Sequence, residues 1–179
     1  NAEVLIIELN TPGGSLDTMI EIISEIRSSN VPVVVYVAPR NAMAGSAGAM
    51  ITMAGHASAM APETSIGASS PISGSGENLD STSAEKAKEI SKAAIRDFVS
   101  PRGTEALALA EAMIDDAKAA TATEALEANL IDFVVDNIDD LLESLDGFTV
   151  QMNDGPRTLD TASAATEPFE MTFIEEFLL

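Results

Sequence analysis

Two adjacent glycines, Gly13 and Gly14, lie between a strand-like apolar segment and a helix-like one. Backbone N–H groups exposed beside a helix N-terminus can bind a negatively charged oxygen, because the helix dipole adds positive potential there. The pair therefore predicts donors for an oxyanion, the charged oxygen that forms when a carbonyl is attacked. Glycine also serves a tight turn without any ligand, so both interpretations stay open. For the oxyanion interpretation, we expect a side chain on Gly14 to crowd the turn and tilt its N–H away.

A serine, Ser46, lies within a run of very small residues: Ala44, Gly45, Ala47 and Gly48. Small neighbours let a substrate backbone approach a serine hydroxyl closely, and a helix start adds positive potential for an attacking oxygen. Ser46 is therefore a candidate nucleophile, and the N–H of Ala47 is a candidate second oxyanion donor. Small residues also permit close helix packing, which is the alternative explanation for the run.

Basic residues cluster in one short stretch of this acidic chain. Lys86, Lys88, Lys92 and Arg96 are four of its nine basic residues. A solvated helix face commonly explains such a cluster. Lys86, however, lies in the first turn of a helix predicted to begin after Ser83, where the helix dipole and burial both lower an ammonium pKa. A lysine with a lowered pKa is a candidate general base.

The helical rotation of roughly 100° per residue separates the lysines into two faces. We predict that Lys86 shares an apolar face, packed on the domain, with Ile90, Ala93 and Ala94. Lys88 then shares a solvated face with Lys92 and Arg96. This register favours Lys86 over its neighbours as the base.

The chain lacks the residues that several other kinds of catalytic site need. The chain has no cysteine and one histidine, His56, which excludes thiolate catalysis and metal sites built from several histidines or cysteines. His56 follows a predicted helix stop and is expected to be structural. The pair Asp115-Asp116 is expected in a solvated loop. We find no phosphate-binding loop, dinucleotide fingerprint or metal motif, and expect no cofactor.

The spacing of apolar residues and the turn-forming residues predict the helices and strands that position these candidate residues. Strands are expected at 4–7, 31–38, 57–61 and 130–135, and helices at 15–27, 46–54, 84–99, 105–114, 121–128 and 138–145. The first strand–helix–strand unit implies a parallel sheet, with strand 4–7 buried on both faces. A capping box at 121–124 and a left-handed stop at Asn129 frame one helix. Residues 69–83 are expected to form a mobile surface loop, 148–159 a hairpin and 160–166 a linker.

The composition of the 179 residues narrows the function classes. Lysine and arginine number 9 and aspartate and glutamate 29, giving a formal charge of −20. This balance disfavours binding to nucleic acid and to anionic membrane surfaces, which both need basic residues. Because 46% of the residues are hydrophobic, the chain can form a substantial core and is not expected to be disordered.

Taken in order, these motifs resemble the ClpP-class membrane-bound serine proteases of the NfeD type. The similar stretches are 9–14, 33–38, 44–48, 60–68 and 123–132, within a resemblance that covers roughly residues 3–146. The resemblance implies a ClpP/crotonase-like α/β fold, with a parallel sheet flanked by helices. The chain departs from the family pattern in two ways. Asn129 stands where a glycine is usual, and the family's opening strand and helix are missing.

The same resemblance implies roles for individual residues. Ser46 matches the nucleophile and Lys86 the base of a Ser–Lys dyad, while Gly14 and Ala47 match the oxyanion donors. Gly13, Gly45 and Ser69 are expected to contact the substrate, Gly13 also shaping the turn. The implied substrates are hydrophobic segments of membrane-associated proteins, including stomatin-like partners, and the implied assembly is a homodimer.

The resemblance also implies a domain division and a location. We expect residues 1–147 to form the protease domain, truncated at its N-terminus, and 148–179 to hold a hairpin, a linker and the start of a membrane-proximal segment. The protein is then membrane-associated, with the protease domain on the extracytoplasmic side. Three alternatives remain: a signal-peptide-peptidase-like protease, a crotonase-type acyl-CoA enzyme, and an inactive scaffold that binds a membrane partner.

Overall fold

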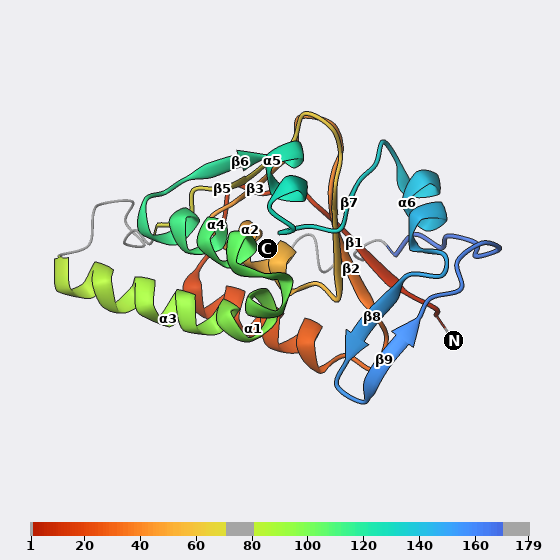
Figure 1. Cartoon of the computed structure of the whole chain (residues 1–179), viewed down its shortest axis with the longest axis horizontal. Helices are drawn as coiled ribbons and strands as arrows, with labels where there is room; N and C mark the ends of the chain where they lie inside the picture. The colour runs from red at the N-terminus through yellow and green to blue at the C-terminus, as the bar shows by residue number, and fades with distance from the viewer. Residues whose placement is uncertain (1, 71–80, 170–179) are drawn as a thin grey trace, which may run out of the picture.

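A four-stranded sheet lies at the centre of the computed structural model, which describes residues 2–70 and 81–169 (Figure 1). Its strands are β1 (Leu5–Leu9), β2 (Val33–Val37), β4 (Ala57–Met60) and β7 (Phe133–Val134), side by side in that order. All three strand pairs are parallel. The predicted α/β class, with helices flanking a parallel sheet, is therefore confirmed.

Both faces of the sheet are covered, and β2 shows why its sequence is uniformly apolar. Alternate residues of a strand point to opposite faces. Val33, Val35 and Val37 join the core formed with α1 (Leu16–Ser28), α2 (Ala47–Ala54) and α4 (Thr104–Asp115). Val34 and Tyr36 join a second core under α6 (Ile138–Leu145) and the hairpin of β8 (Thr149–Met152) and β9 (Gly155–Thr158). Figure 1 shows these two groups of elements on opposite sides of the sheet.

The first strand differs from its prediction. Strand β1 is an edge strand among the described residues, pairing with β2 alone. Its side chains are only partly covered, and Leu5 is 48% exposed. The expectation of burial on both faces was wrong, because an apolar run does not reveal how many neighbours a strand has.

Several predicted helix boundaries are confirmed by their caps. Ser15 caps α1, its Oγ accepting the N–H of Thr18 at 3.2 Å. Thr121 and Glu124 form the predicted capping box of α5 (Ala122–Glu127). Asn129 adopts the predicted left-handed conformation, with φ 58°.

A second, small sheet supports the region around Ser46. It contains β3 (Met43–Gly45), β5 (Ser65–Gly67) and β6 (Ala119–Thr121), in the order β3-β5-β6. Strands β3 and β5 are parallel, and β6 pairs antiparallel with β5. Helix α2 begins directly after β3, so Ser46 lies at a strand-to-helix junction.

The basic cluster lies on α3 (Ser81–Val99), which packs against α2 and α4 and continues into the short helix η1 (Ser100–Arg102). The helix begins before the predicted start at residue 84. Of the predicted loop 69–83, residues 71–80 lie outside the described residues, and 81–83 are helical.

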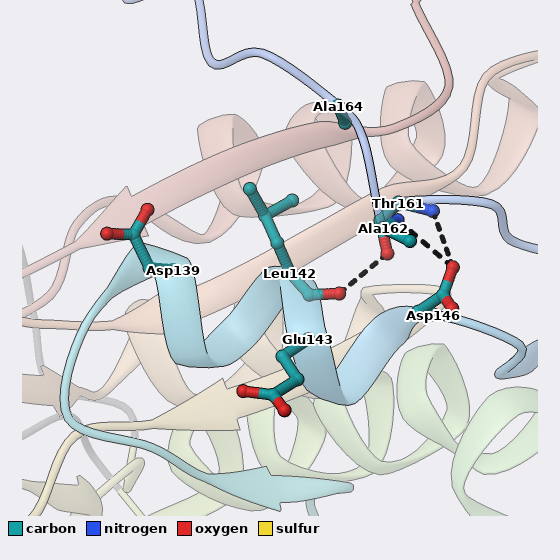
Figure 2. A pocket seen from close by; sticks show the side chains of 7 residues that line it. All are labelled: Asp139, Leu142, Glu143, Asp146, Thr161, Ala162 and Ala164. Carbon is teal, nitrogen blue, oxygen red and sulfur yellow. Dashed lines mark hydrogen bonds between the residues drawn. The ribbon is translucent and has the colours of Figure 1, made fainter.

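The segment after Gly147 packs on the domain. Asn153 donates its side-chain N–H to the carbonyl of Arg27 at 2.7 Å, and Val150 and Met152 are buried in the core under α6. Figure 2 shows how the chain then crosses α6: Thr161 donates to the Leu142 carbonyl at 2.6 Å. Of the helices described, none combines the length and the apolar character needed to cross a membrane.

Candidate active site

Ser46 has the most unusual backbone at the site. It joins β3 to α2 with φ 50° and ψ −116°. A residue other than glycine rarely adopts positive φ, and such a conformation costs of order 1–3 kcal/mol. A strained serine on a sharp strand-to-helix turn is the geometry that exposes the nucleophile of α/β hydrolases. The Ser46 backbone is therefore shaped as a nucleophile's would be.

Hydrogen bonds from three parts of the fold hold this conformation. The Ser46 N–H donates to the Gly67 carbonyl at 2.9 Å. The Ser46 carbonyl accepts from the Ala49 N–H and from the Ser69 hydroxyl, both at 3.1 Å. Strand β5 and the residues after it thus fix both peptide units of Ser46.

The glycine turn packs directly against Ser46. Gly13 has φ 135°, and a Cβ added there would lie 2.7 Å from Ser46 Cβ and 3.3 Å from Ser46 Oγ. A Cβ added to Gly45 would lie 2.8 Å from the Pro12 carbonyl oxygen. The two turns are tied by backbone hydrogen bonds: Thr11 N–H to Met43 O at 2.8 Å and Gly45 N–H to Thr11 O at 2.9 Å. Glycine at positions 13 and 45 is what lets them approach.

Two amides remain for a ligand beside the Ser46 hydroxyl. The Gly13 N–H is used, donating to Thr11 Oγ1 at 3.1 Å, and the Ser46 N–H donates to Gly67. Among the described residues, the amides of Gly14 and Ala47 have no acceptor. These are the two donors that the sequence predicts for an oxyanion.

One part of the glycine prediction was wrong. A Cβ added to Gly14 would meet only Ala47 Cβ, at 4.0 Å, and its φ lies outside the range that strains other residues. The crowded position is Gly13, because that residue faces Ser46. A small side chain on Gly14 therefore fits.

The register predicted for α3 was also wrong. Lys86 is exposed and shares its face with Ile90, which is 50% exposed. The buried face carries Ser91, Ile95 and Val99. The buried face of α3 therefore includes Ser91, while Ile90 lies on the exposed face. For this reason the positions of the apolar residues alone predicted the wrong buried face.

The neighbouring lysines have partners. Lys88 donates to the Asp115 carbonyl at the end of α4. Lys92 pairs with Glu89 and with Asp115, the latter at 3.2 Å. The hydrogen bonds that the Lys92 ammonium donates to Glu89, and then to Asp115, raise the pKa of Lys92. Lys86 makes no hydrogen bond or ion pair with a described residue, and the Ser46 hydroxyl has no lysine partner within the described part of the chain.

His56 is held in a structural role, as expected. Its Nδ1 accepts the Val33 N–H at 3.1 Å, and the residue is 8% exposed. Its Nε2 is buried without a hydrogen-bond partner among the described residues. Burial, and then the positive charge of Arg27, lower the pKa of His56 to about 4, so the ring is neutral at pH 7.

Sequence reasoning missed Thr11. Its hydroxyl both accepts the Gly13 N–H and donates to the Gly13 carbonyl, each at 3.1 Å. Threonine bonding to the backbone two residues ahead is a known turn-forming pattern. The Thr-Pro-Gly-Gly sequence at residues 11–14 could have indicated this threonine-stabilised turn.

A cavity away from these turns is lined by α6 and the chain that crosses it. It has a volume of about 460 Å³, and Asp139, Glu143 and Asp146 contribute carboxylates (Figure 2). Asp146 accepts the N–H groups of Thr161 and Ala162, both at 3.0 Å. These contacts hold the crossing segment in place. Among the described residues, no group of histidine, cysteine or acidic side chains is arranged to hold a metal ion.

The chain is similar to known proteins along most of its length. A sequence model of the NfeD1b N-terminal domain matches residues 1–153. The membrane-bound protease PH1510 of Pyrococcus horikoshii is 39% identical over 153 residues, which are 85% of this chain and 34% of that protein. Membrane protein NfeD1b of Bacillus subtilis is 31% identical over 159 residues, covering 81% of this chain and 34% of that protein. The chain thus spans about a third of the length of these relatives.

Solved structures are similar as well. A lysine-to-alanine mutant of the 1510-N membrane-bound stomatin-specific protease, in complex with a substrate peptide, matches with a TM-score of 0.87 and 33% identity. That match covers 99% of this chain and 82% of the other. A serine-to-alanine mutant of the same protease matches with a TM-score of 0.84 and 33% identity, covering 96% of this chain and 84% of the other.

Proposed function

Because the chain belongs to the NfeD1b N-terminal domain family, we propose that it is the serine endopeptidase domain of a membrane-bound protein, with Ser46 as nucleophile. One observation carries the proposal: the strained Ser46 lies at a strand-to-helix turn beside the amides of Gly14 and Ala47, which have no acceptor among the described residues. An inactive scaffold would have no need to maintain this costly conformation.

The proposed reaction is acyl transfer. A neutral lysine amine accepts the Ser46 hydroxyl proton as Oγ bonds to the scissile carbonyl carbon. The Gly14 and Ala47 N–H groups stabilise the oxyanion that forms. The C–N bond then breaks, the lysine returns its proton to the leaving amine, and water hydrolyses the acyl-enzyme.

We assign the base to Lys86. A base needs an available amine that is neutral at the working pH. The Lys88 amine is already bound to the Asp115 carbonyl, and the acidic partners of Lys92 stabilise its charged form. Lys86 has no such partner among the described residues. Lys86 is exposed and makes no hydrogen bond to Ser46 among the described residues, so we propose that the two side chains meet when substrate binds.

The names of the relatives support a proposal for the substrate class. The similar solved protease is named as stomatin-specific, and we propose that this domain likewise cleaves a hydrophobic segment of a stomatin-like membrane protein. We further propose that it lies on the extracytoplasmic side of the membrane and acts as a homodimer. Residues 1–147 would carry catalysis, and 148–179 would lead toward the membrane.

The central test is the Ser46→Ala variant, assayed with a fluorogenic peptide that carries an apolar stomatin-like segment and with a fluorophosphonate probe. We expect cleavage to fall at least roughly a thousandfold and labelling to disappear, with an unchanged thermal midpoint. Ser144→Ala is the matched control, since Ser144 is a half-buried residue of α6, across the sheet from Ser46, and donates to the Asp140 carbonyl. A Ser46→Ala variant with wild-type cleavage would refute the serine protease and favour the scaffold.

A lysine series tests the base. Lys86→Ala should abolish acylation, while Lys88→Ala and Lys92→Ala should leave most of it. The wild-type rate should rise with pH as the base loses its proton. Loss of acylation in Lys88→Ala alone would assign the base to Lys88, and cleavage of signal peptides in preference to the stomatin-like peptide would favour the signal-peptide-peptidase alternative.

A further inference from the structure

Each proposed oxyanion donor shares a peptide unit with a carbonyl that is itself hydrogen-bonded. The Gly14 N–H belongs to the same planar group as the Gly13 carbonyl, and the Ala47 N–H to the same group as the Ser46 carbonyl. Because a peptide unit is planar and rigid, a hydrogen bond that fixes its carbonyl also fixes the direction of its N–H. The partners of these two carbonyls therefore control where the donors point.

The first carbonyl is held by Thr11. Thr11 Oγ1 donates to the Gly13 carbonyl at 3.1 Å. Thr11 is itself fixed by its backbone bonds to Met43 and Gly45. Its methyl group lies against α2, since a Cβ added to Gly48 would be 2.6 Å from Thr11 Cγ2. The hydroxyl therefore has a defined direction.

The second carbonyl is held by Ser69. Ser69 Oγ donates to the Ser46 carbonyl at 3.1 Å, and the Ser69 N–H donates to the Met113 carbonyl at 2.8 Å. Ser69 is only 5% exposed, so its hydroxyl faces inward, toward the carbonyl of Ser46. The end of α4 thus positions Ser69, which in turn holds the peptide unit of Ala47.

We propose that Thr11 and Ser69 are positioning residues, each orienting one of the two oxyanion donors. This inference rests on the proposed serine protease function and gives Ser69 a different role from the substrate contact expected from the sequence. Neither hydroxyl takes part in bond making. Each acts through the N–H on the far side of its peptide unit, and its effect is greatest when the oxyanion carries its full charge.

The test uses Thr11→Val and Ser69→Ala, which remove each hydroxyl while nearly preserving shape. The assays are peptide cleavage and inhibition by a peptide boronate, whose boron bonds to Ser46 Oγ and places a negatively charged tetrahedral group at the donors. We expect each variant to lower kcat about tenfold, the effect of one lost hydrogen bond. Boronate affinity should fall by a similar factor, and KM should change less than about threefold.

Two controls match these variants. Thr11→Ser keeps the hydroxyl and should retain kcat. Ser70→Ala removes the adjacent hydroxyl, which donates to Ile114 O at 2.8 Å and not to Ser46, and should also retain kcat. Thermal midpoints are measured throughout, and if Thr11→Val does not fold, the comparison of Ser69→Ala with Ser70→Ala decides.

The outcomes separate this inference from the proposed function. Wild-type kcat and boronate affinity in Ser69→Ala, with cleavage still dependent on Ser46, would overturn the positioning role alone. An equal loss in Ser70→Ala would assign the effect to general loosening of the segment and also overturn it. Cleavage that does not depend on Ser46 would refute the proposed function instead.

Discussion

Replacing Gly13 by alanine should damage both the fold and the nucleophile. The added Cβ would lie 2.7 Å from Ser46 Cβ, about 0.7 Å short of ordinary van der Waals contact, and the φ of 135° strains any L side chain. The strain costs of order 1–3 kcal/mol, and overpacking costs a similar amount. Since one small movement relieves part of both, we expect the free energy of unfolding to fall by about 3 kcal/mol. The thermal midpoint should then fall by about 6–12 °C.

Activity should fall by more than stability explains. The atom that must move is Ser46 Cβ, which carries the attacking oxygen, and a displacement near 1 Å costs about a hundredfold in rate. We therefore expect Gly13→Ala to lower the rate of acylation by the fluorophosphonate roughly 30- to 100-fold, measured well below its thermal midpoint. At that temperature the variant is folded, so the loss reports geometry.

Gly14→Ala is the control on the same turn. Its Cβ has room and ordinary backbone angles, so its acylation rate should stay within about threefold of wild type and its stability within about 1 kcal/mol. Equal damage from both substitutions would show that the turn tolerates no side chain at all. Wild-type acylation in Gly13→Ala would refute the inferred contact between the turn and Ser46.

Three further predictions concern stability. The pKa of His56 lies near 4 in the folded state and near 6.5 when unfolded, so its contribution is present above pH 6.5 and is lost as the pH falls toward 4. Between pH 7 and pH 5, the free energy of unfolding measured with urea should fall by about 2 kcal/mol more in wild type than in His56→Asn. Parallel pH profiles for the two proteins would contradict this. Asp132 forms two hydrogen bonds with Arg102, and both side chains are 14% exposed. Asp132→Asn removes the charge of this pair and should lower the free energy of unfolding by roughly 3 kcal/mol without changing fluorophosphonate labelling. An unchanged thermal midpoint would mean that the pair acts as a weak surface contact. Truncation after Gly147 uncovers the core under α6 and should lower the thermal midpoint, while the folded fraction still reacts with the probe; a folded but unreactive product would show that the removed segment takes part in catalysis.

The sequence alone identified the features that depend on neighbouring residues. The strand–helix–strand opening, the helix start at Ser15, the Thr121–Glu124 capping box and the left-handed Asn129 all follow from local backbone chemistry. The small residues around Ser46 and the glycines after the first strand indicated the candidate site for the same reason. Local conformational preference depends on residues that are adjacent in the sequence, so it can be inferred without knowing the fold.

Tertiary structure alone decided which residues face one another. Helix α3 has few large apolar side chains, so its partners α2 and α4 select the face with Ser91 and Ile95 and leave Ile90 in solvent. The contact of Gly13 with Ser46 and the hydrogen bonds of Ser69 join segments that are far apart in sequence. Such contacts depend on the three-dimensional register of packed elements, for which no local pattern exists. The conformation of Ser46, which cannot be stable by itself, is fixed by these distant contacts.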